Sequence, residues 1–200
     1  MQVDYAIELG REDETLEFPW AASDESSRYH DLKRNQRKIA EIEEAARFPE
    51  LREFLILMNG TTSPLETAKC DAWSSDEIHP EEEIFGERWK FGSYVDLLFT
   101  ETSARYSFDC YEDLLKRWVV LLQRPPEMPA SAEFLLRRCF CHEGEEVRDG
   151  FYVTFYLFGF GSGEAKARQQ WASALKLAAN AFAEVSAELR VPSTEYRVKT

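Results

Sequence analysis

The stretch from Gly150 to Gly163 constrains the fold more than any other part of the chain. It reads Gly-Phe-Tyr-Val-Thr-Phe-Tyr-Leu-Phe-Gly-Phe-Gly-Ser-Gly. Successive side chains of a strand point to opposite faces of its sheet, and large residues occupy both sets of alternating positions here. Such a strand lies inside a sheet that is covered on both faces. We therefore expect a central strand with more of this chain, a second copy or a ligand against each face.

The order of the expected elements predicts an α+β fold from about residue 92. Val95 to Phe99 alternate as a strand, and Ser107 opens a helix with an apolar stripe that ends at Leu122. Two long strands at 132–142 and 150–160 follow as an antiparallel hairpin, then a helix at 164–190 and an edge strand at 194–198. This strand-helix-strand-strand-helix-strand order is ferredoxin-like, with both helices on one face of an antiparallel sheet.

The first 91 residues give weaker patterns. Residues 3–9 and 16–18 predict a hairpin, and helices are expected at 24–47 and 49–58, the second ended by Asn59-Gly60. Residues 61–91 lack a sustained period and are expected to be irregular, with a short strand at 67–73. With 200 residues and 44% apolar content, the chain suits one domain. We predict a single domain at 1–200, made of residues 1–60, an irregular segment at 61–91 and an α+β core at 92–200.

Charge excludes several classes of partner. The net charge is -13 and the pI is about 4.8, so the chain repels phosphate backbones and anionic membranes. The aromatic strand is placed as in RNA-recognition modules, but Arg148–Phe155 does not match their pattern. The chain also lacks a membrane-length apolar run and a secretion signal. We expect a cytoplasmic protein with free thiols that binds neither nucleic acid nor membranes.

Two hypotheses for function follow from the aromatic strand. A ferredoxin-like sheet leaves its second face open, so the rings of Tyr152, Tyr156 and Phe158 need a cover. The first hypothesis is a homodimeric interaction or regulatory protein, with the second copy as the cover. The alternative is a small-molecule-binding protein or an enzyme, with a pocket between the sheet and residues 61–91. The candidate pocket residues are Trp73, His79, Arg88, Trp89, Tyr152 and Tyr156.

No motif in the chain specifies a reaction or a cofactor. Cys139-Phe140-Cys141-His142, together with Cys70 or His79, offers zinc-ligand chemistry. However, the chain has no second cysteine pair, and cysteines in strands are more often small buried hydrophobes. The glycines from Gly159 to Gly163 match neither the dinucleotide fingerprint nor a P-loop, so we predict a flexible turn there. We expect no metal and no cofactor, and whether the protein is an enzyme stays open.

Overall fold

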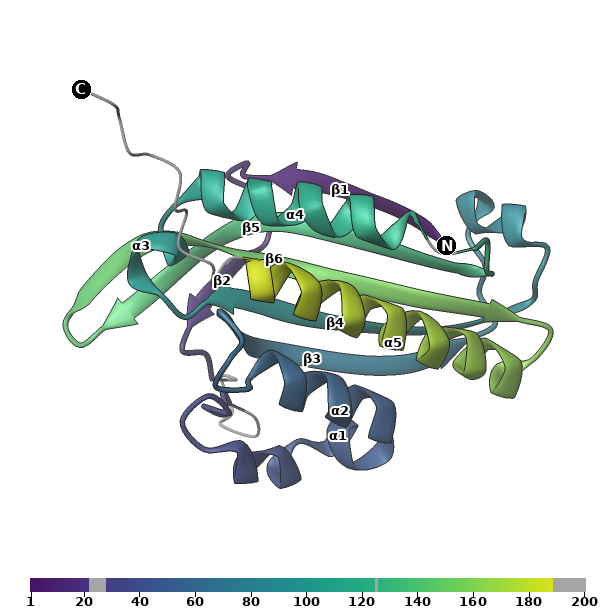
Figure 1. The fold of residues 1–200 in the computed structure, drawn as a ribbon, viewed down its shortest axis with the longest axis horizontal. Helices are drawn as coiled ribbons and strands as arrows, with labels where there is room; N and C mark the ends of the chain where they lie inside the picture. The colour runs from purple at the N-terminus through teal and green to yellow at the C-terminus, as the bar shows by residue number, and fades with distance from the viewer. Residues whose placement is uncertain (22–27, 125, 189–200) are drawn as a thin grey trace.

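A computed structural model describes residues 1–21, 28–124 and 126–188, and it is built on one six-stranded mixed sheet (Figure 1). The strand order is β1-β5-β6-β4-β3, and β2 pairs with β5 beside β1. The strands are β1 (Gln2–Glu8), β2 (Thr15–Phe18), β3 (Leu65–Ser75), β4 (Trp89–Phe99), β5 (Ala130–Glu143) and β6 (Glu146–Gly161). The helices are η1 (Gln36–Glu41), α1 (Glu43–Arg47), α2 (Pro49–Met58), η2 (Pro80–Phe85), α3 (Thr102–Arg105), α4 (Phe108–Leu122) and α5 (Glu164–Glu188).

The ferredoxin-like prediction and the N-terminal hairpin are both wrong. β1 and β2 do not pair with each other: each runs parallel to β5, β1 along residues 131–137 and β2 along residues 138–141. The sheet is therefore mixed rather than antiparallel. The long edge of β5 supplies hydrogen bonds to both short strands. The turn residues between β1 and β2 do not reveal this shared partner. β3 takes the place beside β4, and the predicted edge strand at 194–198 lies outside the described residues.

Two further expectations for the N-terminal half are corrected. In the described part of 24–47, helix is restricted to η1 and α1, because Ile42 has an extended backbone that separates them. The segment 61–91 is not irregular, since it holds the whole of β3, which is an eleven-residue strand, and η2. β3 carries a bulge between Thr67 and Cys70, which interrupts its alternation and hides the strand pattern.

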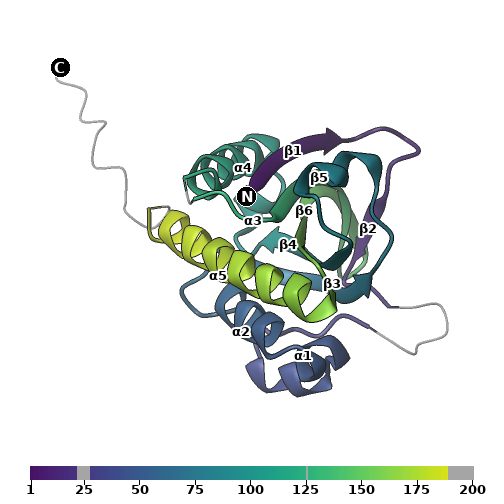
Figure 2. The same ribbon diagram turned by 90° about the vertical axis from the view of Figure 1, so that its right-hand side faces the viewer.

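Helices α4 and α5 lie side by side on one face of the sheet (Figure 2). Between helices and sheet lies the main hydrophobic core, where Trp118 stacks on Phe182 at 3.9 Å and Phe134 on Phe155 at 5.0 Å between ring centroids. One face of the aromatic strand is thus covered by this chain.

The described helices include none long and apolar enough to cross a membrane.

Two glycines let α5 pack directly on β6. A Cβ atom at Gly159 would lie 2.1 Å from the backbone nitrogen of Trp171, and one at Gly161 would lie 2.4 Å from that of Ala167. β6 extends through Gly161, so only Ser162 and Gly163 separate the strand from the helix. The predicted flexible turn is therefore shorter than expected, because the first two glycines are strand residues at a close helix contact.

The second face of the sheet is covered at one end only. After β2, the chain crosses this face from the edge at β5 to the edge at β3, where the indole of Trp20 donates to the carbonyl of Ala68 at 2.8 Å. Beneath it lies a small core of Leu16, Phe18, Leu98, Cys139, Cys141 and Tyr152.

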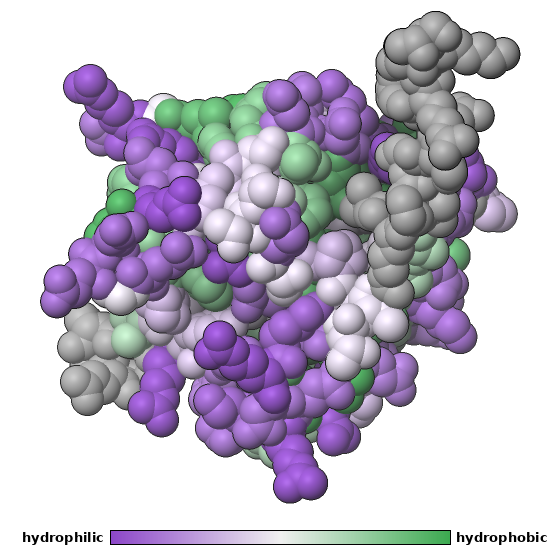
Figure 3. All heavy atoms as spheres, turned by 60° about the vertical axis from the view of Figure 1, so that its left-hand side comes forward, coloured by the Kyte–Doolittle hydropathy of each residue, from purple (hydrophilic) through white to green (hydrophobic). Residues whose placement is uncertain are grey.

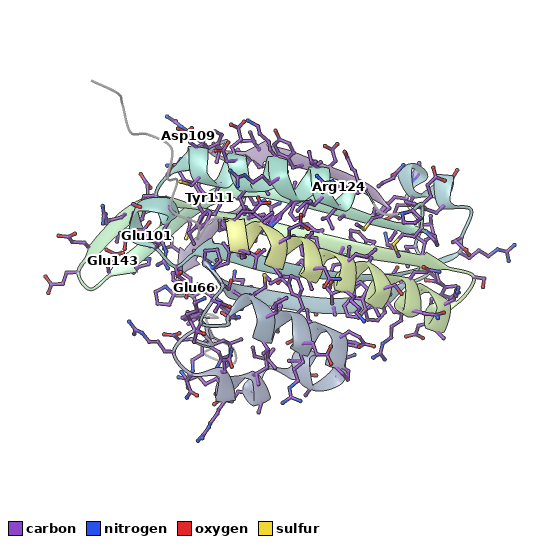
Figure 4. All side chains as sticks on the ribbon, in the orientation of Figure 1. Glu66, Glu101, Asp109, Tyr111, Arg124 and Glu143 are labelled. Atoms are coloured by element: carbon purple, nitrogen blue, oxygen red, sulfur yellow. The ribbon has the colours of Figure 1, made fainter. Side chains whose placement is uncertain are left out.

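A polar cluster around Glu66 lies at this end too. Tyr29 donates to Glu66, which also binds Arg105. Figure 4 places Glu66 at the same end as Tyr111 and Glu143. The surface at this end of the molecule is mainly hydrophilic (Figure 3).

Candidate functional site

The uncovered part of the second face begins with a buried polar group, Asp96. This residue follows Tyr94 on the same face of β4 and is only 3% exposed. Thr154 on β6 donates to its Oδ1 at 2.7 Å. Burial raises the pKa of Asp96 to about 7, against the opposing effects of the Thr154 hydrogen bond and the nearby Lys69. Asp96 is thus a carboxyl group that changes protonation near neutral pH.

Arg137 connects this carboxyl group to the N-terminal strands. Its guanidinium donates to Glu8 at 2.7 Å and to Glu14 at 2.9 Å, and it reaches the hydroxyl of Thr154 at 3.4 Å. Arg137 is 8% exposed. The arginine is therefore neutralised by two carboxylates, and with Asp96 and Thr154 it forms what we call the polar belt across β5, β6 and β4.

Next to the polar belt, four aromatic side chains form a continuous surface that we call the aromatic platform. It consists of Trp73, Tyr94, Tyr156 and Phe158, all partly exposed. Consecutive ring centroids are 6.5 Å apart for Trp73 and Tyr94, 5.8 Å for Tyr94 and Tyr156, and 6.4 Å for Tyr156 and Phe158. Trp73 and Phe158 meet at 5.9 Å and close the group. The platform thus spans β3, β4 and β6.

Gly92 on β4 makes room for two of these rings. A Cβ atom there would lie 2.7 Å from Phe158 and 3.0 Å from Trp73. The two rings therefore lean toward each other over the backbone of the strand, where any larger residue would displace them. They meet edge to face, with an angle of 78° between the ring planes.

Helix η2 encloses the outer end of the platform, at the right-hand end of Figure 1. Phe85 stacks on Phe160 of β6 at 4.3 Å, and Glu82 accepts a hydrogen bond from Lys90 at 2.8 Å. Between η2 and the sheet lies a hollow of about 540 Å³. It is lined by Trp73, Ser74, Ser75, Glu77, His79, Glu82, Lys90, Glu133 and Phe158. Phe158, Glu82 and Glu133 also border an adjoining hollow of about 900 Å³ that reaches the N-terminus.

The structure brings together only part of the predicted pocket set. Trp73 and His79 line the hollow, and Tyr156 belongs to the platform beside it. The other three residues lie elsewhere. Arg88 is exposed before β4, Trp89 packs on the helix-covered core, and Tyr152 is buried under the crossing segment.

Cys139 and Cys141 form a close pair, and two other candidate zinc ligands, Cys70 and His142, lie apart from it. The sulfurs of Cys139 and Cys141 are 3.6 Å apart, and this hydrogen bond lowers the pKa of Cys141 to about 7 and raises that of Cys139. Cys70 lies apart from them on β3, and His142 is exposed and bound to Glu17. Among the described residues, no group of three or more histidine, cysteine, aspartate or glutamate side chains could hold a metal ion.

Residues that the pocket prediction omitted carry most of the polar chemistry. Asp96 stands within the apolar run Val95–Phe99, and Arg137 follows Phe134-Leu135-Leu136. A charged residue inside an otherwise buried strand needs a partner, because an unpaired buried charge is costly. That pattern is the signal that could have identified both residues.

A third hollow, of about 530 Å³, lies at the β3 edge and is bordered by Trp20, Lys69, Asp71, the segment 41–44 and Tyr94 of the aromatic platform. It is separate from the hollow under η2.

Comparisons of the chain with protein-family models, with curated proteins and with solved structures found no match.

Proposed function

We propose that the protein binds a small organic molecule with a flat apolar ring, held between η2 and the aromatic platform. One observation carries this proposal: four neighbouring rings stay partly exposed on a sheet whose other face, and whose other end, are covered by the chain itself. Contiguous exposed apolar patches are typical of binding surfaces. A hollow of about 540 Å³ also falls within the usual range for small-molecule sites, roughly 300 to 1,000 Å³.

The surroundings of the platform suit selective binding. Ligand sites combine apolar walls with a few placed polar groups, and here the polar belt lies on one side of the rings and Lys90, Glu82 and Glu133 on the other. The Gly92 contact and the Phe85 stacking preorganise these walls, which reduces the entropy that binding would cost. The proposed location is the cytoplasm, which the four free cysteines favour.

Tryptophan side-chain NMR signals test this proposal directly. The chain has five tryptophans, so a ¹⁵N-labelled sample gives five indole N–H signals, and Trp73→Phe identifies the signal of the platform. The probes are 3-methylindole, tryptamine and indole-3-acetate at millimolar concentrations. At least one probe should shift the Trp73 signal and leave those of the fully buried Trp118 and Trp171 in place.

Two variants control for the site and for the fold. Phe158→Ala should abolish the shift, because it removes one wall of the hollow. Phe140→Ala should preserve it, because this ring is also partly exposed but lies far along β5, opposite Asp149. If none of the three probes moves the Trp73 signal, or if Trp20 at the β3 edge responds instead, the proposal fails.

The homodimer remains a prediction. It follows from the apolar residues on both faces of the aromatic strand. However, this chain itself covers the helix face and Tyr152. What is left for a second copy is the platform, which the ligand hypothesis also uses.

A further inference from the structure

We infer that the ligand of the hollow is an organic cation, whose ring rests on the aromatic platform while its ammonium group lies near Glu133. This inference rests on the proposed function and adds the charge of the ligand to it. It is carried by the rings, by the balance of charges around them and by the position of one lysine.

The platform already holds an ammonium group of this chain. The Nζ atom of Lys90 lies 5.7 Å from the centroid of the Phe158 ring. Aromatic faces are electron-rich and attract cations within about 6 Å of their centroid. Lys90 occupies this position at one border only, and the rings of Trp73, Tyr94 and Tyr156 offer the same kind of surface.

The charges beside the rings favour a cation over an anion. Lys90 is already neutralised by Glu82, and Arg137 by Glu8 and Glu14. Lys69 lies near the buried Asp96, away from the hollow under η2. Among the carboxyl groups that line the hollow, Glu82 is paired with Lys90, but Glu77 and Glu133 form no ion pair with the described residues. An anionic ligand would therefore face surplus negative charge, whereas a cationic ligand would compensate it.

Glu133 flanks the platform at the surface, and Asp96 flanks it as a buried group. Glu133 is the cross-strand neighbour of Tyr156 on β5, and Asp96 follows Tyr94, which is the neighbour of Tyr156 on β4. Burial raises the pKa of both acids, and Glu8 and Asp4 add to the effect at Glu133. Lys69 and Arg137 partly compensate the buried Asp96, whereas the exposed Glu133 has Arg137 alone against its acidic neighbours. A bound ammonium group would therefore supply the missing positive charge at Glu133.

The three indole probes separate this inference from the proposed function, since they share one ring system and differ in charge. Titrations that follow the Trp73 signal give their dissociation constants at low ionic strength. Tryptamine should bind roughly tenfold more tightly than 3-methylindole, and indole-3-acetate should bind most weakly. Equal affinities, or tightest binding of indole-3-acetate, would overturn the inference while leaving the proposed function intact.

Matched substitutions locate the charges responsible. Glu133→Gln and Glu77→Gln should each reduce the preference for tryptamine over 3-methylindole several-fold, because each removes a carboxylate that lines the hollow. Glu53→Gln removes the same charge from the exposed surface of α2 and should leave the preference unchanged. A preference that all three variants lower alike would reflect only the net charge of -13 and would contradict a local site.

Discussion

Replacing Gly159 with alanine tests the close contact between α5 and β6. The added Cβ atom would lie 2.1 Å from the nitrogen and 2.6 Å from the Cα of Trp171, and 2.6 Å from the carbonyl oxygen of Ala167. All three are backbone atoms, so no side chain can rotate away and the helix itself must move. Overpacking a well-packed contact costs about 1 to 3 kcal/mol. We expect the upper end, about 3 kcal/mol, because the helix carries much of the core.

For a chain of this size, each kcal/mol lowers the melting temperature by about 2 to 4 °C, so Gly159→Ala should lower it by roughly 6 to 12 °C. Thermal unfolding followed by circular dichroism measures this shift. Gly163→Ala is the matched control, since its Cβ atom would meet nothing within 4 Å. That variant should unfold within about 2 °C of the wild type, because a solvent-facing substitution of this kind is worth about 0.5 kcal/mol or less. If both variants change the melting temperature by the same amount, the close contact between α5 and Gly159 is not what requires a glycine there, and the reasoning is refuted.

Two other predictions concern buried groups on the second face. Burial raises the pKa of Asp96 to about 7 from its ordinary 3.8, so the folded state retains a proton that the unfolded state releases, and stability falls as pH rises between these values. The free energy of unfolding of Asp96→Asn in urea should therefore rise relative to that of the wild type between pH 5 and pH 8. If the difference between the two proteins stays the same over this range, the raised pKa is contradicted. A thiol reagent should modify the exposed Cys110 in the native protein, but Cys139 and Cys141 only after unfolding, and rapid native modification of that pair would show that their end of the sheet opens.

Elements with an uninterrupted local pattern were predictable from the sequence. The stripe from Phe108 to Leu122, the Pro49 start of α2 and the paired strands β5 and β6 all lie close to their expected ranges. The spacing of side chains within a helix or strand depends on the nearby sequence alone, so it can be read without knowledge of the fold. The pairing partner of a strand cannot be read from the nearby sequence. The sequence pattern therefore pairs β1 with β2 instead of with β5, which lies more than a hundred residues away.

The candidate site was predicted only in part for the same reason. Trp73 and His79 were expected near a pocket because they lie in the segment before β4, and they do line the hollow. Lys90, Glu133 and Phe158 join them through strand register, which the sequence does not display. Trp89 lies outside the hollow because adjacent strand residues point to opposite faces, so it faces away from Lys90. Arg88 lies outside it because it precedes β4 and is exposed.

The two faces of β6 have different uses because of what packs against them. On the helix face, Gly159 and Gly161 bring α5 so close that no ligand or partner can reach the strand. On the second face, the exposed carboxyl groups of Glu77 and Glu133 border the rings. A two-fold dimer sets each patch against its own copy, so a dimer through the platform would bring these like charges together. An organic cation meets the same rings and carboxylates without that repulsion, which is why the acidic border favours a ligand over a second copy at this surface.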